Sequence, residues 1–317
     1  MKNRPRNGMI MLCLFVSASL FSCQKEDVSS ATSNSNADQV EVIDPNFVND
    51  PSDLDVPYEP PIADDVNQNA ATASIISVGT RKNLMFNFTT EASNALSLFS
   101  YTSALNYGSL QKTASYSVQK TSAYARFGSY STRYELRKTD PLVGSGKRSE
   151  ALRYSKSEPV VKVERWYAAS YYLPSDYVPD AAPECITQWH TNIGSPPLAI
   201  WTQNGQLYVT RFGNKLFSLG AYTKNQWFDL VLHVKWSTTS DGLIEVWKNG
   251  AKVFTYNGAN ILTNATYGAY MRTGLYKWPW NPTSKIVSST TQRVLYVDEV
   301  RIGNASATYY DVAPGNY

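Results

Sequence analysis

Residues 227–256 read WFDLVLHVKWSTTSDGLIEVWKNGAKVFTY, and this stretch decides the fold class. After a first strand at 227–236, a second strand is expected at 243–247. It leads into Asn249-Gly250, a dipeptide that favours a two-residue hairpin turn, and 251–256 forms the return strand. In the first ten residues the apolar side chains recur at every second position, the period of a strand with one buried face: Phe228, Leu230, Leu232, Val234 and Trp236. The stretch therefore predicts strands paired in an antiparallel sheet.

The same pattern continues through the rest of the domain. Further strands are expected at 129–138, 166–173 and 294–302, and the 22 tyrosines and 8 tryptophans suit strands. Neither an amphipathic helix of useful length nor a repeat of fixed period stands out. Many strands with one apolar face each predict an all-β fold, a concanavalin-type β-jelly-roll sandwich of two antiparallel sheets with a concave substrate cleft.

The N-terminus has the features of an export signal. Three basic residues among the first six precede an apolar stretch at 9–20, which is too short to span a bilayer comfortably. Leu20-Phe21-Ser22-Cys23 resembles a bacterial lipobox. We expect 1–22 to be a lipoprotein signal peptide and Cys23 to be lipidated in the outer membrane, facing the periplasm or the cell surface. An ordinary secretory signal is the alternative.

Charge divides the remaining chain into two parts. Residues 23–72 hold 1 basic and 11 acidic residues, a net charge of −10, and read as an acidic disordered spacer. Residues 73–317 carry a net charge of +10 and form the folded domain. A basic domain on an acidic tether predicts an anionic partner, and for an exported protein this is acidic polysaccharide and not nucleic acid. We expect a monomer that contacts the membrane through lipidated Cys23.

The three cysteines exclude some kinds of site. Cys13 leaves with the signal and Cys23 carries lipid, so Cys185 remains alone. Neither a disulfide framework nor a thiolate metal site can be built from one cysteine. We expect Cys185 to be a small buried hydrophobic residue.

The candidate chemistry lies on three segments. In Gln188-Trp189-His190, a period of two places Gln188 and His190 on one face, together with Ile186, and Trp189 in the core. His190 is one of only two histidines in the chain. At 270–278 the same period groups Tyr270, Arg272, Gly274 and Tyr276, and at 147–150 it groups Arg148 with Glu150. The three segments would offer these side chains to one concave surface if their strands were neighbours.

These segments resemble the three motif blocks of jelly-roll polysaccharide lyases. RSEALR at 148–153, QWH at 188–190 and YMRTGLYKW at 270–278 are similar to the alginate lyase blocks RSELR, QIH and YFKAGVYNQ. The closer resemblance, over about residues 75–312, is to the heparin lyase I-like and glucuronan lyase group. It implies that 73–317 is a lyase domain that cleaves a uronate-containing chain by β-elimination, glucuronan first, with heparin-type glycosaminoglycan or alginate second.

The resemblance implies a role for each catalytic residue. Removal of the C5 proton builds charge on the uronate carboxylate, which Arg148 and Gln188 would neutralise. His190 and Tyr276 would act as base and acid. In glucuronate the C5 hydrogen and O4 lie on the same side, so Tyr276 alone could serve both steps, whereas in a C5 epimer His190 would be the base and Tyr276 the acid.

Further residues are candidates for substrate binding: Arg272, Lys277, Glu150, Arg137 and His233. Arg272 and Lys277 would supply the positive charge that a basic tyrosine needs, although the heparin lyase I pattern has lysine at the position of Arg272. Alternatives stay open for several residues. Arg148 could pair with Glu150, Arg133, Glu135 and Arg137 could form a charge ladder, and His233 could be structural.

No cofactor is required by this reading, and no metal is assigned to the active site. A structural Ca²⁺ at Asp298-Glu299 is possible, with an ordinary ion pair as the alternative. Two other functions compete with the lyase. A glycoside hydrolase of the laminarinase type would need a Glu-x-Asp-x-Glu cluster, which the domain lacks. A non-catalytic glycan-binding lipoprotein would explain the aromatic residues and the charge, but not His190 and Tyr276 in these contexts.

Overall fold

The computed structural model describes residues 81–99, 106–144, 146–155 and 158–315. The predicted signal peptide, the lipidated Cys23 and the acidic spacer lie outside the described residues. Within the described part of the chain, no helix is both long enough and apolar enough to cross a membrane.

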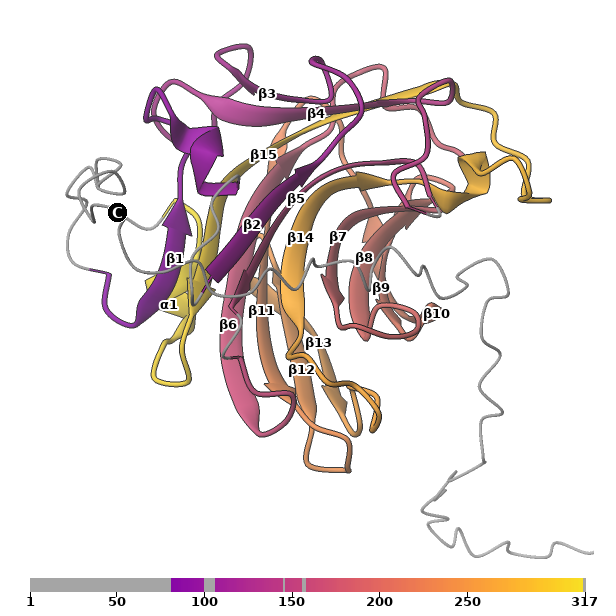
Figure 1. Cartoon of the computed structure of the whole chain (residues 1–317). Coiled ribbons are helices and arrows are strands. Elements are labelled where there is room, and N and C mark those ends of the chain that lie inside the picture. The colour runs from indigo at the N-terminus through magenta and orange to yellow at the C-terminus, as the bar shows by residue number, and fades with distance from the viewer. Residues whose placement is uncertain (1–80, 100–105, 145, 156–157, 316–317) are drawn as a thin grey trace, which may run out of the picture. The chain divides into compact units, whose positions relative to one another are not determined.

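Two antiparallel sheets make up the fold, so the predicted all-β class is confirmed (Figure 1). The first sheet has eight strands in the order β13-β12-β11-β6-β15-β4-β3, with β1 paired to β15. Their bounds are β1 Leu84–Phe88, β3 Val118–Thr121, β4 Ser131–Arg137, β6 Val163–Tyr172, β11 Trp227–Trp236, β12 Leu243–Lys248, β13 Ala251–Asn257 and β15 Gln292–Gly303.

The second sheet has seven strands in the order β10-β9-β8-β7-β14-β5-β2. Figure 1 shows β5 and β14 following a curved path beside β7. The described helices are short: η3 Ala95–Phe99, η4 Trp278–Trp280 and α1 Tyr309–Val312. The strand bounds are β2 Asn106–Gln111, β5 Arg148–Ser155, β7 Glu184–His190, β8 Leu198–Gln203, β9 Gln206–Arg211, β10 Asn214–Ala221 and β14 Tyr270–Tyr276.

Residues 227–256, which predicted the fold class, form the expected strands and hairpin. Strand β11 has the predicted bounds, and its alternate apolar residues all belong to the core between the sheets. At the turn between β12 and β13, Asn249 and Gly250 have φ of 50° and 85°. This left-handed backbone is what a tight hairpin turn requires, and Asn and Gly adopt it with little strain.

The core is filled by large side chains from both sheets. Trp236 and Tyr171 of the eight-stranded sheet and Trp189 and Leu275 of the seven-stranded sheet are each at most 1% exposed. Burial of each such side chain contributes roughly 1.5–3 kcal/mol to folding. Trp189 is therefore in the core, as predicted.

A β-bulge in β7 changes one predicted face. The register between β7 and β8 shifts between Cys185 and Thr187. Ile186 consequently joins the core cluster, while Cys185 lies in a separate cluster with Trp201 and Tyr276. The prediction that Ile186 shares a face with Gln188 is wrong, because a bulge inserts one residue and breaks the period of two. Cys185 is fully buried, as expected.

Candidate active site

The three predicted segments lie on adjacent strands of the seven-stranded sheet. Strand β14 pairs with β7 on one side and with β5 on the other. In this register Gln188 lies opposite Arg272, and His190 lies opposite Tyr270. On the other side Tyr276 lies opposite Arg148. Seven side chains thus share the sheet face turned away from the core, and we call them the polar strip: Arg148, Glu150, Gln188, His190, Tyr270, Arg272 and Tyr276.

Glu150 is at the centre of the polar strip. Gln188 Nε2 donates a hydrogen bond of 2.6 Å to Glu150 Oε1. The other oxygen, Oε2, lies 4.0 Å from Arg148 Nη1 and 3.9 Å from Arg272 Nη1. Two guanidiniums around one carboxylate leave a formal charge of +1 on buried groups, where electrostatic interactions are stronger than in water. This centre can attract and hold an anion.

Arg272 is held by two further side chains. Its Nη2 donates to Tyr270 Oη at 2.7 Å, and its Nη1 donates to Gln111 Oε1 at 3.3 Å. Gln111 belongs to β2 and lies opposite Glu150 in the β2–β5 register. Sequence reasoning missed Gln111, because no motif marks it and only the pairing of β2 with β5 brings it to the site.

The cation beside Tyr276 is Arg148. The guanidinium carbon of Arg148 lies 4.3 Å from the centre of the Tyr276 ring, and the Trp278 ring lies 5.7 Å away on another side. We expected Arg272 and Lys277 to supply positive charge to this phenol. In the structure Arg272 instead donates to Tyr270, its neighbour on the same strand face.

Gly146 makes room for the Tyr276 ring. A Cβ atom at Gly146 would lie 2.2 Å from Tyr276 Cε2 and 2.9 Å from its Oη. Contacts this short do not occur between real atoms, so any larger residue would move the ring. The backbone at Gly146 therefore fixes one side of the phenol.

His190 has a defined tautomer. Its Nδ1 is hydrogen-bonded to the carbonyl oxygen of Thr191. A carbonyl can only accept, so Nδ1 carries the hydrogen, and Nε2 is the nitrogen through which a neutral ring would accept a proton. An imidazole in this state can accept a proton.

His190 and Tyr276 flank the centre of the polar strip. His190 pairs with Tyr270, whereas Tyr276 lies opposite Cys185 at the other end of β7. At a rise of 3.3 Å per residue, the two ends are about 16 Å apart along the strand. The guanidiniums and Gln188 lie between them.

The sequence matches a family model described as "Polysaccharide lyase" over residues 99–301. The chain belongs to this polysaccharide lyase family. The family match covers all three segments of the polar strip, and it identifies the protein as an enzyme. No curated protein sequence matches the lyase.

Solved structures with similar folds include lyases and a hydrolase. An endo-β-1,4-glucuronan lyase from the fungus Trichoderma reesei has a TM-score of 0.60 and 21% identity, covering 74% of this chain and 100% of its own. The catalytic domain of a glycoside hydrolase family 131 protein from Coprinopsis cinerea has a TM-score of 0.51 and 12% identity. The match covers 71% of this chain and 96% of that domain. A polysaccharide lyase family 7 alginate lyase has a TM-score of 0.45 and 14% identity. The match covers 61% of this chain and 85% of that enzyme. The likenesses with TM-scores above 0.5, to the glucuronan lyase and the hydrolase, confirm the jelly roll alone.

Two predicted substrate-binding residues of the lyase lie on the other sheet. His233 on β11 is bracketed by Glu164 Oε1 at 2.7 Å and Glu245 Oε2 at 2.8 Å, and its ring stacks on Trp166. These contacts account for both ring nitrogens, and they favour the structural role that was the alternative for His233. Alternation along β11 correctly predicted that His233 lies on the face away from the core. It did not show that β11 belongs to the eight-stranded sheet, away from the polar strip.

Arg137 also belongs to the eight-stranded sheet, on β4. Its guanidinium pairs with Glu135, which also pairs with Arg133. The three side chains alternate along one face of β4, so they form the charge ladder that was the alternative to substrate contact.

Lys277 points away from the polar strip. Its fully buried ammonium lies 3.2 Å from Asp180 Oδ2 and 3.2 Å from Glu184 Oε2, and it donates to the carbonyl of Ala182. Arg293 pairs with the same Glu184. Lys277 follows the last residue of β14, and its contacts place its side chain in this buried cluster and not on the polar strip.

The carboxyl groups around Lys277 are stabilised in their charged form. Burial alone would raise the pKa of Asp180, but the hydroxyls of Ser288 and Thr290, the Ala182 N–H and the charge of Lys277 together lower that pKa. Burial likewise opposes ionisation of Glu184, yet Arg293 and then Lys277 lower its pKa. The cluster is therefore a charged structural anchor.

Asp298 and Glu299 do not fit a Ca²⁺ site. Asp298 accepts backbone N–H bonds from Arg126 and Phe127, and Glu299 pairs with Arg301 at 2.6 Å. Burial raises the pKa of Asp298 to about 7, which weakens it further as a cation ligand. Calcium needs six to eight free oxygen ligands, and these oxygens are already used by N–H donors.

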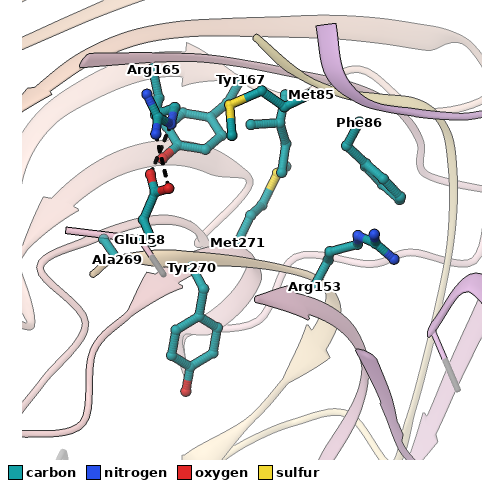
Figure 2. Close-up of a pocket in the computed structure, with 10 residues that line it drawn as sticks. Met85, Phe86, Arg153, Glu158, Arg165, Tyr167, Ala269, Tyr270 and Met271 are labelled. Atoms are coloured by element: carbon teal, nitrogen blue, oxygen red, sulfur yellow. Dashed lines mark hydrogen bonds and ion pairs between the residues drawn. The ribbon is translucent and has the colours of Figure 1, made fainter. Parts of the chain in front are cut away.

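A pocket between the sheets borders the polar strip, because Tyr270 is one of the residues that line it (Figure 2). Arg153, the last residue of the RSEALR segment, lies opposite Met271 in the register and therefore faces the interior, where it contacts the Phe86 ring. Figure 2 shows the Tyr270 ring pointing away from Met271. The second arginine of that segment thus does not belong to the active face.

Replacement of Gly146 by alanine should displace the Tyr276 phenol. Gly146 has an ordinary φ, so the backbone tolerates alanine and the effect comes from the new Cβ. We expect kcat to fall roughly 10–100-fold, because small misplacements of catalytic groups are costly, with little change in thermal stability. In a Tyr276→Phe background the same change should have little further effect. Equal losses in both backgrounds would show that Gly146 acts elsewhere.

Lys277→Met should destabilise the fold. Removal of the ammonium leaves two buried carboxylates poorly compensated, so we expect the free energy of unfolding to fall by about 3–5 kcal/mol, measured by urea denaturation. The pKa values of Asp180 and Glu184 lie below their ordinary 3.8 and 4.5, so their stabilisation is present above those values and is lost as the pH falls. The deficit of the variant should therefore shrink below about pH 4.

Lys285→Met provides the matched control, because Lys285 is exposed. It should leave the stability unchanged. A Lys277→Met enzyme of normal stability with greatly raised KM would instead place Lys277 on the substrate.

Proposed function

We propose that this polysaccharide lyase cleaves a uronate-containing anionic polysaccharide by β-elimination, with a glucuronan-like β-1,4-linked chain as its first substrate. The observation that supports the proposal is the placement of Arg148, Arg272 and Gln188 around Glu150, between Tyr276 and His190. Heparin-type glycosaminoglycan and alginate are the second candidates.

The charge at the centre of the polar strip suits the difficult part of this reaction. The C5 proton of a uronate is acidic only because it lies beside the carboxylate, and its removal spreads negative charge onto the carboxylate oxygens. Fixed donors aimed at that charge lower the barrier, and each is typically worth about 3–4 kcal/mol. We propose that Arg148, Arg272 and the free N–H of Gln188 provide this neutralisation, and that no cofactor is required.

The elimination then proceeds with balanced proton transfers. A base takes the C5 proton, and the C–H electron pair becomes the C4–C5 double bond. The C4–O4 bond breaks, and an acid protonates O4 of the departing chain. The products are an unsaturated uronate at one new end and a free hydroxyl at the other.

The roles of Tyr276 and His190 depend on the stereochemistry of the uronate. In glucuronate, the C5 hydrogen and O4 lie on the same side, so Tyr276 takes the proton and returns it to O4. The Arg148 guanidinium over the ring favours the negative phenolate between these steps. His190 then helps to hold the carboxylate. In a C5 epimer, His190 is the base through Nε2 and Tyr276 is the acid.

A panel of uronans tests this function. The domain should release unsaturated uronate, detected by ultraviolet absorbance, fastest from glucuronan among glucuronan, alginate, heparin and hyaluronan. A panel without any unsaturated product would overturn the lyase mechanism. Release from heparin or alginate alone would replace the proposed substrate.

Histidine variants provide a matched comparison in the same assay. His190→Ala should lower kcat at least about 100-fold, as expected for loss of an acid–base or carboxylate-binding group. His233→Ala, on the other sheet, should keep near-normal turnover. Similar rates for both variants would exclude His190 from the chemistry.

We also propose that the lyase is an outer-membrane lipoprotein anchored through Cys23, supported by the lipobox-like Leu20–Cys23 and the acidic residues that follow. Cys23→Ser should abolish lipid labelling and release the protein from the membrane fraction. Cys13→Ser, within the signal, should leave anchoring intact. A Cys23→Ser protein that remains in the membrane fraction would contradict this anchor.

A further inference from the structure

Two buried oxygen atoms at the centre of the polar strip have no hydrogen-bond donor among the described residues. They are Gln188 Oε1 and Glu150 Oε2. Gln188 is 1% exposed and Glu150 is 0% exposed. The orientation of the Gln188 amide is determined by its partner, because only the Nε2 group can donate to the carboxylate at 2.6 Å. The carbonyl oxygen of Gln188 therefore faces away from Glu150.

The neighbouring guanidiniums do not satisfy the Glu150 oxygen. Arg148 Nη1 and Arg272 Nη1 lie 4.0 and 3.9 Å from Oε2, beyond hydrogen-bond distance. Buried acceptors in folded proteins are almost always paired, so two unpaired acceptors on side chains that are bonded to each other call for a donor from a ligand. Both atoms can only accept. The missing partner is thus a group that donates, and on a uronate ring this is a hydroxyl.

We infer that Glu150 and Gln188 recognise free ring hydroxyls of the uronate and make the lyase selective for unsulfated chains. This inference rests on the proposed function. The net charge of +1 still attracts one carboxylate, which Arg148 and Arg272 can meet. A sulfate on a hydroxyl next to Glu150 would bring a second anion against a buried carboxylate, and it would also remove the donor that Glu150 and Gln188 need.

The selectivity expected from such a site is large. A site built to hydrogen-bond a substrate hydroxyl rejects an analogue that lacks it by up to about 10,000-fold, because its buried polar groups are left unpaired. Repulsion between like charges adds to this effect for a sulfate. Glu150 thus separates glucuronan and alginate from heparin-type chains.

The first experiment uses the wild-type protein. Glucuronan or alginate, whichever is cleaved faster, is compared with the same polymer after exhaustive O-sulfation and after exhaustive O-methylation. Methylation removes the donor without adding charge. We expect kcat/KM to fall at least about 100-fold for both derivatives. Equal turnover of the methylated and parent polymers would overturn hydroxyl recognition, and equal turnover of the sulfated polymer would overturn selectivity against sulfate.

The second experiment uses Glu150→Gln, which keeps the shape of the side chain but removes its charge. The rate on the parent polymer should fall, while the ratio of sulfated to parent turnover should rise at least about tenfold. Glu164→Gln, on β6 of the other sheet, should leave both the rate and the ratio unchanged. A ratio in Glu150→Gln equal to that of the wild type would remove Glu150 from specificity.

The outcomes separate this inference from the proposed function. A wild-type enzyme that forms no unsaturated uronate from any polymer contradicts the β-elimination itself. A wild-type enzyme that cleaves parent and modified polymers alike contradicts only the inference. If Glu150→Gln fails to fold, as shown by thermal unfolding, the wild-type comparison decides alone.

Discussion

The active face depends on the placement of β14 between β5 and β7. This pairing brings the three segments together, and it requires close approach of the backbones. At Gly274, opposite Glu150, φ is 126° and a Cβ would lie 2.3 Å from the Ser149 carbonyl oxygen. Only glycine fits a backbone of this kind. The register that aligns Arg272 with Gln188 and Tyr276 with Arg148 therefore rests on a position that tolerates no side chain.

Two buried charge clusters, one around Glu150 and one around Lys277, differ in how well their groups are paired. Lys277 sits 3.2 Å from each of two carboxylates, and Arg293 reinforces one of them, so the charges there compensate one another. Around Glu150 the guanidiniums stay near 4 Å from an oxygen that accepts no hydrogen bond in the described structure. Well-paired charges stabilise a fold, whereas an excess of charge with open hydrogen-bonding capacity is suited to a ligand.

The alternation of apolar and polar residues along each strand was the main basis for predicting the strands and their buried faces. It predicted the bounds of β11, the hairpin at Asn249-Gly250 and the burial of Trp189. Alternation predicted the wrong face for Ile186. A β-bulge depends on how β7 pairs with β8, and the sequence of β7 alone does not show that pairing. Alternation could not assign His233 to a sheet, since it indicates a face and says nothing of which strands are neighbours. Gln111 and Gly146 act through contacts between distant segments, so no local pattern marks them.

The jelly-roll fold alone does not determine which reaction an enzyme catalyses. The Coprinopsis cinerea hydrolase has a similar fold, and hydrolysis of a glycosidic bond generally uses two carboxyl groups as acid and base or nucleophile. Among the seven side chains of the polar strip Glu150 is the one carboxyl group, and the remaining charged, phenolic and imidazole groups are two guanidiniums, two phenols and an imidazole. Positive charge of this kind stabilises a carboxylate that gains electron density, which elimination requires and hydrolysis does not. The side chains that β5, β7 and β14 place on one face are therefore what favours the elimination we propose, and the jelly roll serves as their frame.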